Sequence, residues 1–230
     1  MNSWKNDAEL FSFAKEKLFT ALVGDVMDKM GLYHQFLPPA LKPLDCNSVI
    51  IGRAMPVLEM DVFGEIVEDS HNPLLKKPFG AMFEALDDLK ENEIYICTGS
   101  SLRYALWGGL MSVRAQKLKA AGAVVNGFSR DTNEVLRLGF PVFSLGTYAQ
   151  DQGPRGKVID YRIPIEWDGI RISPGDIIFG DRDGVIVIPK EAEKEAFSKA
   201  IEKALGEKLV LKALESGKSA TTVFKEFGIM

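Results

Sequence analysis

The feature that most constrains how this chain can fold is an alternation of short apolar strands and helices between residues 93 and 146. Three strands are predicted, because short apolar runs stand between turn residues: Glu93–Cys97, Ala123–Asn126 and the PVFSLG segment 141–146. Two helices are predicted between them, Gly109–Ala121 and Asp131–Leu138, each followed by a glycine that can end it. Strands that alternate with helices in this order predict an α/β core.

The segments before this core favour further helices and one more strand. Lys5–Leu18 has the spacing of an amphipathic helix. Thr20 is the predicted N-cap of a second helix, which ends at Gly31. Asn47–Leu58 contains the apolar run VII and is predicted to be a strand, whereas Phe79–Leu89 is predicted to be a helix.

The chain changes character from Gly156 onward. The segments KVIDYRIPI, GIRI, DIIFGD and GVIVIP are short and apolar, and Gly, Pro and Asp separate them. They predict an antiparallel or mixed sheet packed beside the α/β part. A long charged helix follows at Lys190–Glu215, and ATTVFKEFG predicts a last short helix. Because no linker separates these parts, residues 1–230 are predicted to form one domain, with a helical extension at about 190–230.

Composition narrows the classes of partner. The net charge is −4, and Lys and Arg are interspersed with Glu and Asp, which argues against a nucleic-acid partner. No apolar run approaches the ~20 residues that span a bilayer, so no membrane partner is expected. The start, MNSWKNDAELFSF, lacks the pattern of a secretory signal, and a cytoplasmic location is expected. Cys46, Cys97, His34 and His71 are isolated, which indicates reduced thiols and no zinc site.

The GFSRDT segment, Gly127–Thr132, has the residue types of a binding site and follows a predicted buried strand. The planar fork of Arg130 suits bidentate binding of a carboxylate. Asp131 could hold a hard divalent cation through one oxygen, with water and substrate completing the shell. The alternative is a surface arginine beside an aspartate that caps the following helix.

Two further segments contain residue types that a binding site can use. Gly108, Gly109, Leu110 and Met111 stand at the predicted mouth of a helix, where backbone N–H groups can bind an anion. Close packing of helix on sheet explains a glycine pair equally well. In GDRDGVIVIP, two aspartates flank a turn that leads into a strand, and here the structural interpretation is favoured.

Four segments in order resemble the RraA-like family, which includes class II 4-hydroxy-4-methyl-2-oxoglutarate and 4-carboxy-4-hydroxy-2-oxoadipate aldolases. They are LWGGLMS, AGAVVNGFSRDTNEVLRLGFPVFSLGT, ISPGDIIFGDRDGVIVIP and VFKEFGIM, and the resemblance runs from about Thr20 to the end. It implies a swivelling β/β/α fold of the α/β class, with mixed sheets, flanking helices and a long C-terminal helix. It also implies homotrimers or homohexamers with active sites between subunits.

The resemblance implies an enzyme, a metal-dependent lyase that releases pyruvate from small 2-oxo acids. Cleavage of 4-hydroxy-4-methyl-2-oxoglutarate or decarboxylation of oxaloacetate would proceed through a metal-stabilised enolate. By this resemblance Asp131 anchors Mg²⁺ or Mn²⁺ and Arg130 binds substrate oxygens. Backbone amides around Leu110 and Met111, which follow Gly108 and Gly109 in the sequence, hold the pyruvyl carboxylate. Glu207 loosely matches a catalytic glutamate that a neighbouring subunit's C-terminal helix contributes.

One position departs from the family pattern. The aldolases have an acidic residue in the arrangement Asp-x20-Arg-Asp, and Gly109 stands at that place here. Because that acidic residue is absent, the proton transfer of aldol cleavage is in doubt, and another residue could supply the base. Oxaloacetate decarboxylation is therefore expected to survive better than aldol cleavage.

Arg103, Asp151 and Arg155 lie in loops near the motif, and Arg103 is either a site for a second carboxylate or a surface charge.

Two other functions fit the resemblance. Some relatives regulate ribonuclease E through protein contact, and a non-catalytic regulator of that kind needs no metal-dependent pyruvate release. The family once carried a methyltransferase label. Such a cofactor favours a glycine-rich loop after a first strand and an acidic residue at the end of the next, and the sequence has no such pattern.

Overall fold

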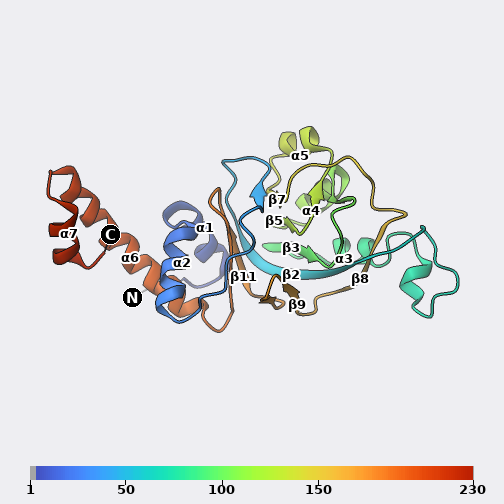
Figure 1. Cartoon of the computed structure of the whole chain (residues 1–230), viewed down its shortest axis with the longest axis horizontal. Helices are drawn as coiled ribbons and strands as arrows, with labels where there is room; N and C mark the ends of the chain where they lie inside the picture. The colour runs from blue at the N-terminus through green and yellow to red at the C-terminus, as the bar shows by residue number, and fades with distance from the viewer. Residues whose placement is uncertain (1–3, 230) are drawn as a thin grey trace.

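A computed structural model describes residues 4–229. Residues 1–3, which belong to the start that is expected to lack a secretory signal, and residue 230 of the predicted domain lie outside the described residues. The centre of the structure is one eight-stranded mixed sheet (Figure 1). The strands run in the order β1–β7–β5–β3–β2–β11–β12, and β8 pairs with the far end of β2. Their bounds are β1 Lys42–Pro43, β2 Ile50–Asp61, β3 Glu93–Thr98, β5 Gly122–Val125, β7 Val142–Ser144, β8 Gly156–Tyr161, β11 Ile177–Gly180 and β12 Val185–Ile188.

The parallel strands β2, β3, β5 and β7 form the α/β core that the sequence predicted. The expectation of a second sheet after Gly156 is wrong for most of that region. β2 is 12 residues long, so its first part pairs with β11 and its last part with β8, and these strands extend the main sheet. Within the described residues, only β9 (Ile165–Trp167) and β10 (Ile170–Ile172) form a separate hairpin in this region.

The two faces of the parallel strands are covered differently. Tyr95 and Cys97 point toward α3 (Met82–Asp87), α4 (Gly109–Lys117) and α5 (Thr132–Leu138) and join one apolar core. Ile94 and Ile96 point to the opposite face, where the β9–β10 hairpin covers them with Trp167. This alternation follows from the period of two residues in a strand.

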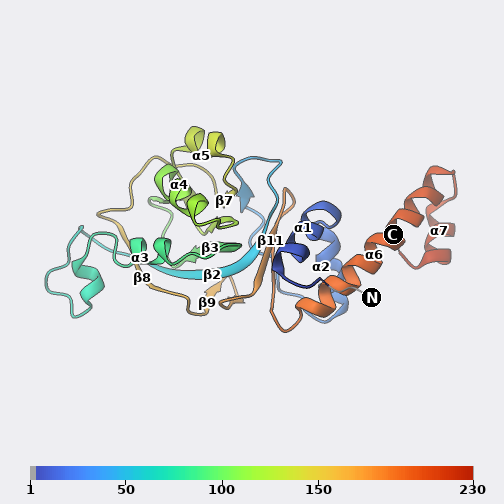
Figure 2. The ribbon, with the colours of Figure 1, turned by 180° about the vertical axis from the view of Figure 1, so that it is seen from behind.

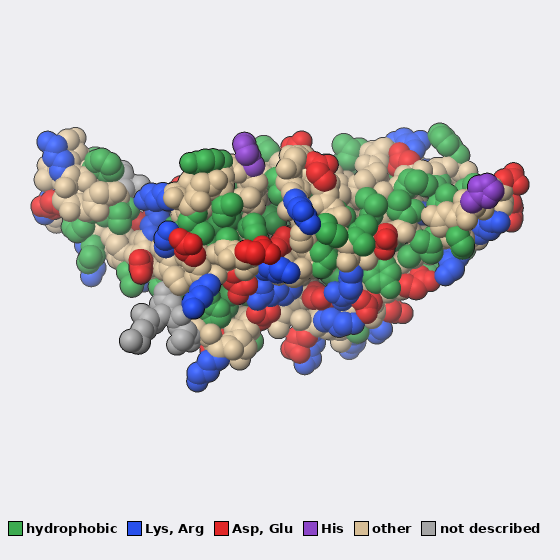
Figure 3. All heavy atoms as spheres, turned by 90° about the horizontal axis from the view of Figure 1, so that it is seen from below, with side chains coloured by type: hydrophobic (Ala, Val, Ile, Leu, Met, Phe, Trp, Pro, Cys, Tyr) green, Lys and Arg blue, Asp and Glu red, His purple; other side chains and the backbone are tan. Residues whose placement is uncertain are grey.

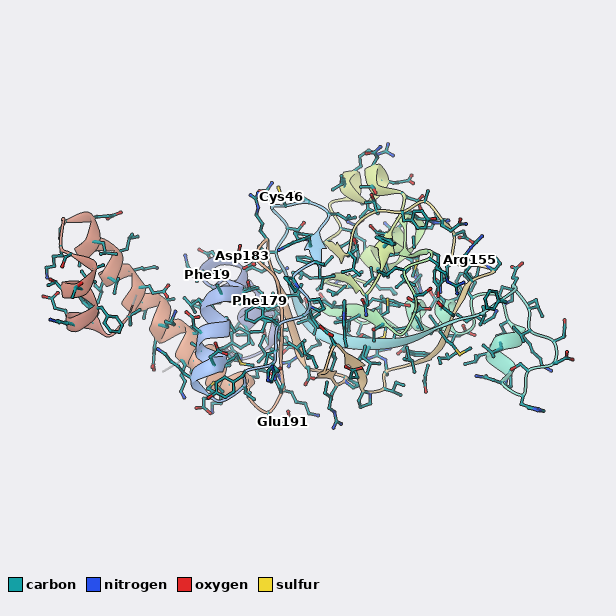
Figure 4. The ribbon with its side chains drawn as sticks, viewed as in Figure 1. Phe19, Cys46, Arg155, Phe179, Asp183 and Glu191 are labelled. Carbon is teal, nitrogen blue, oxygen red and sulfur yellow. The ribbon has the colours of Figure 1, made fainter. Side chains whose placement is uncertain are left out.

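A second group of helices packs at the other end of the sheet. α1 (Asp7–Lys17), α2 (Thr20–Lys29) and the start of α6 (Glu193–Glu215) cover β11 and β12 with an apolar core of their own. Thr20 is the first residue of α2 and not its N-cap. Its N–H and its hydroxyl each donate a 2.7 Å hydrogen bond to Asp181, which confirms the structural interpretation of that aspartate. Figure 4 labels Phe19 and Asp183, which belong to the two segments that this contact joins.

The sequence predicted that Gly122 ends a helix, but in the structure it does not. The helix ends at Lys117, and Lys119 takes the left-handed conformation that reverses the chain. Gly122 instead opens β5, where an added Cβ would lie 2.5 Å from Ile50 Cδ1 and 2.6 Å from the Pro141 carbonyl oxygen. Close approach of neighbouring strands, rather than helix termination, is therefore what this glycine permits.

The C-terminal helices extend away from the rest of the molecule. α6 (Glu193–Glu215) extends outward from the sheet and the helices that cover it, and α7 (Ala220–Phe227) folds back against α6 (Figures 1 and 2). A 3₁₀ turn, η1 (Pro73–Lys76), lies in the loop that protrudes at the opposite end (Figure 2). The mixed α/β sheet, its flanking helices and the long C-terminal helix confirm the predicted fold class. Among residues 4–229, no helix is both long and apolar enough to cross a bilayer.

Candidate functional site

Two short parallel strands bring the two predicted site segments together. β4 (Ala105–Trp107) pairs with β6 (Phe128–Ser129). Gly108 and α4 follow β4, whereas Arg130, Asp131 and α5 follow β6. Because the carboxyl ends of parallel strands meet at one edge, the N-termini of α4 and α5 lie side by side.

Asp131 directs its carboxylate away from the helix that it precedes. Its backbone is left-handed, with φ 57°, and its side chain makes no capping bond to α5. Asp131 Oδ2 instead accepts a 3.0 Å hydrogen bond from Gly109 N, at the start of α4. Asp131 therefore occupies the N-cap position of α5, as the alternative expected, but its side chain does not cap that helix. The carboxylate lies in the positive potential of the neighbouring helix terminus.

The glycine pair makes this approach possible. A Cβ on Gly108 would lie 2.9 Å from Asp131 Oδ2 and 3.4 Å from Arg130 Cγ. A side chain at position 108 would therefore push the aspartate off the helix terminus. Leu110 and Met111 follow in the first turn of α4, where N–H groups have no partner within the helix. Tight packing at the glycine pair therefore brings the Asp131 carboxylate to the start of α4, and binding of a substrate anion by the amides there stays a prediction.

Arg130 lies between two carboxylates. Its Nη1 is 2.9 Å from Asp151 Oδ1, and its Nε is 4.0 Å from Asp131 Oδ2. Its backbone N–H donates to the Trp107 carbonyl, which ties the end of β6 to the end of β4. The second oxygen of Asp151 accepts a 2.8 Å hydrogen bond from Gly153 N, so this acid is held from both sides.

These groups surround a cavity of about 240 Å³. Its lining is mainly apolar and includes four polar or charged side chains. The lining residues are Phe79, Met82, Phe83, Ala105, Leu106, Trp107, Gly108, Leu110, Met111, Arg130, Asp131, Asp151 and Gln152. Leu110, 87% exposed, stands at the mouth. A second hollow of about 380 Å³ lies against the other side of Asp131, along 129–132 and 147–149. A small anion with an apolar portion matches the first cavity in size and polarity.

A buried acid lies behind the cavity wall. Glu59 follows a bulge in β2 and is 2% exposed. Its Oε2 accepts a 2.9 Å hydrogen bond from Gln152 Nε2, and its Oε1 has no partner within residues 4–229. Burial raises the pKa of Glu59 to about 8, against the opposing effect of the Gln152 bond. Glu59 is therefore mainly a neutral carboxylic acid at pH 7.

Sequence reasoning missed Glu59 and Gln152 and left Asp151 unassigned. The only signal for Glu59 is a lone acid in the apolar run PVLEM, on the same strand face as Val57. Nothing in the local sequence marks Gln152, because its role depends on a partner 93 residues away.

Three residues considered from the sequence do not join the cavity. Glu207 lies on α6 and forms a 2.6 Å ion pair with Lys203, so its expected role in a neighbouring subunit's site stays a prediction. Arg103 forms a 2.9 Å ion pair with Asp61. Arg103 and Arg155 line a different hollow, and Figure 4 shows Arg155 on the loop before β8.

On the face that Figure 3 shows, positive and negative side chains are interspersed, as the sequence predicted. Across residues 4–229, no three His, Cys, Asp or Glu side chains gather into a metal-binding group. Asp131 nevertheless fits a hard cation of the Mg²⁺ type. Such ions commonly use one or two carboxylates and complete their shell with water and substrate.

The fold and the site define an α/β protein with a small, mainly apolar pocket, in which a carboxylate and an arginine meet a helix N-terminus. A family model described as Aldolase/RraA, of the RraA-like proteins, matches residues 20–187. The chain therefore belongs to the RraA-like family, as its motifs predicted.

Two relatives show how widely this sequence pattern occurs. A provisionally named 4-hydroxy-4-methyl-2-oxoglutarate aldolase of Halalkalibacterium halodurans is 30% identical over 207 residues, which cover 90% of each chain. Protein DlpA of Legionella pneumophila is 30% identical over 200 residues, 86% of this chain. The match spans only 30% of the length of DlpA.

Solved structures share the fold over most of the chain. One, described as belonging to novel cellulases from microbes associated with the gut ecosystem, has a TM-score of 0.79 and 29% identity. It covers 90% of this chain and 89% of its own. RraAS2 of Streptomyces coelicolor, described as an unusual member of the RNase ES inhibitor RraA family, has a TM-score of 0.74. Its 21% identity over 90% of this chain and 98% of its own supports the fold alone.

Proposed function

We propose that this protein is a divalent-metal-dependent lyase that cleaves or decarboxylates small 2-oxo acids to give pyruvate. The observation that supports it best is the bond from Gly109 N to Asp131 Oδ2, in a pocket that Arg130 also lines. This arrangement brings a carboxylate suited to a cation, helix amides and a guanidinium together in one small cavity. The family membership and the aldolase names among the relatives agree with this proposal.

Each residue then has a definite task. Asp131 would hold Mg²⁺ or Mn²⁺, which supplies Lewis-acid stabilisation of charge on the substrate's keto oxygen. The N–H groups of Leu110 and Met111 would bind the adjacent carboxylate at the positive end of α4. Arg130 would bind a substrate oxygen and stabilise negative charge as the C–C bond breaks. The apolar wall would exclude water from the reacting carbon.

Arg130 must change partners for this to work. In the structure its guanidinium is paired with Asp151, and both side chains are about two-fifths exposed. Pairs of such exposure contribute about 1 kcal/mol or less, so a substrate carboxylate can compete for the arginine.

Pyruvate release by the purified protein tests the proposal. The substrates are oxaloacetate and 4-hydroxy-4-methyl-2-oxoglutarate, each with Mg²⁺, with Mn²⁺ and with a chelator. Asp131→Asn is the matched control, since it keeps the shape of the side chain and removes the charge. Release that requires the metal and disappears in Asp131→Asn supports a lyase. Release that persists in the variant places the chemistry elsewhere.

The alternative, a protein-binding regulator of the ribonuclease E inhibitor type, predicts no pyruvate release and no effect of Asp131→Asn on binding. We also expect a homotrimer or homohexamer, in which Glu207 of one subunit reaches the pocket of the next. Light scattering measures the oligomeric state, and a monomer would exclude that role for Glu207. A cytoplasmic location stays a prediction.

A further inference from the structure

The carboxylate of Glu134 lies over Gly109 at the start of α4. A Cβ built on Gly109 would lie 3.1 Å from Glu134 Oε2 and 3.3 Å from Asp131 Cβ. Two acids, three residues apart at the start of α5, therefore flank the backbone of residue 109. The space that a side chain at 109 would enter is already occupied by the Glu134 carboxylate.

We propose that Glu134 supplies the carboxylate that moves protons at the Asp131 site, from α5 instead of from position 109. This inference rests on the proposed lyase function. Glu134 does not line the cavity, so it would act through one ordered water at the rim, a range that general bases commonly use. Gly109 and Glu134 are then complementary: the glycine leaves the room that the glutamate needs.

The chemistry requires such a group for one substrate more than for the other. In cleavage of 4-hydroxy-4-methyl-2-oxoglutarate, a base takes the proton of the 4-hydroxyl while the C3–C4 bond breaks. The bond's electron pair moves into the enolate of one pyruvate, and C4 becomes the ketone of a second. The proton is then returned to C3. In oxaloacetate, CO₂ leaves with no hydroxyl proton to remove, and water can protonate C3.

The other acids around the cavity are engaged. Asp131 is bonded to Gly109 N and is the proposed cation ligand. Asp151 is held by Arg130 and Gly153 N, and Glu59 is buried and bonded to Gln152.

The charged contact of Glu134 with Arg137 is weak by comparison. Its Oε1 is 4.0 Å from Arg137 Nη2, and their side chains are 61% and 76% exposed. A pair this long and this exposed holds the carboxylate only loosely. Glu134 therefore combines proximity to the site with freedom to accept a proton.

Glu134→Gln tests the inference, because it removes the charge and keeps the size. We expect kcat for the aldol substrate to fall about 10²-fold, the lower end of the usual contribution of general acid–base catalysis. Oxaloacetate kcat should stay within about 3-fold, and KM for both substrates should change little. The matched control is Glu195→Gln, in the first turn of α6, whose side chain is 60% exposed and also pairs with a basic residue of its own helix.

A rescue variant separates a chemical role from a structural one. Glu134→Ala should lose aldol cleavage, and Gly109→Asp in the same chain should restore at least about a tenth of it, since the space is then free for a carboxylate from α4. Equal loss for both substrates, or full aldol activity in Glu134→Gln, would overturn the inference.

Binding of Mn²⁺, measured by calorimetry, is the readout that does not depend on turnover. Loss of a nearby negative charge in Glu134→Gln should raise the Kd for Mn²⁺ about 3- to 10-fold, whereas Asp131→Asn should abolish binding. If the wild-type protein releases no pyruvate, the proposed function fails. An unchanged Kd in Glu134→Gln would overturn the placement of the Glu134 carboxylate beside the cation site, and a raised Kd would support that placement even where no pyruvate is released.

Discussion

Replacing Glu59 by glutamine should remove a large pH dependence from the stability of this protein. Glu59 is fully buried, and its pKa is raised from 4.5 to about 8 in the folded chain. An acid with a raised pKa binds its proton more tightly when folded than when unfolded. Its stabilising effect is therefore complete below about pH 4.5 and is lost as the pH rises toward 8.

The size of the effect follows from the shift. Each pKa unit corresponds to about 1.4 kcal/mol, so Glu59 alone should lower the free energy of unfolding by up to about 5 kcal/mol between these limits. Residual hydration of the carboxylate would reduce this figure. Glutamine has nearly the same shape, can still accept the bond from Gln152, and does not ionise. Glu59→Gln should therefore be the more stable protein at pH 8, by a few kcal/mol.

Urea unfolding at half-unit steps from pH 5 to pH 8 measures this, as the difference between the two proteins. Taking the difference cancels groups that both proteins share, among them Asp176, whose pKa is raised by burial. Tyr95 and Cys97 face Glu59, and burial raises the pKa of each well above its usual value, so their ionisation lies beyond this range. A difference that stays constant from pH 5 to pH 8 would refute the reasoning, because Glu59 would then have to be ionised in the folded chain.

Three other substitutions test the geometry of the site. Gly108→Ala should weaken Mn²⁺ binding at least about 10-fold with little change in Tm, because its Cβ would displace Asp131; unchanged calorimetry would contradict this. Asp151→Asn releases Arg130, and oxalate, a small dicarboxylate, should bind about 3-fold more tightly at low salt, an effect that 0.5 M salt should remove. Asp131→Gly should be about 1 kcal/mol more stable than Asp131→Ala in urea, because only glycine accepts the left-handed backbone at no cost. Equal stabilities would mean that the backbone relaxes in both.

The α/β core could be predicted because its signal is local. Apolar runs of strand length alternate with helices over residues 93–146, and each predicted element is present with shifted ends. The later strands β8 and β11 were predicted as strands but assigned to the wrong sheet. Their partner is β2, which lies more than 90 residues earlier in the chain. Strand propensity identifies a strand, but tertiary packing chooses its neighbour.

The site residues also divide into those that the sequence could identify and those that it could not. Arg130, Asp131 and the glycine pair stand in two recognisable segments, and the structure brings these segments together. Asp151, Glu59 and Glu134 reach the same region from a loop, a strand bulge and a helix face. Each looks like an ordinary acidic residue in its own segment, so only the fold reveals that they lie near the same site.

The conformation of Asp131 explains why its carboxylate is available for ligands. An aspartate before a helix ordinarily has an extended backbone, and its side chain then bonds to that helix. Here the left-handed backbone costs about 1–2 kcal/mol and turns the side chain toward α4 instead. Hydrogen bonds from Glu134 N to Asp131 O and from Arg130 N to Trp107 O hold the turn in place. Packing of two helices would not by itself require this strain, and strain maintained at a pocket is typical of a functional site.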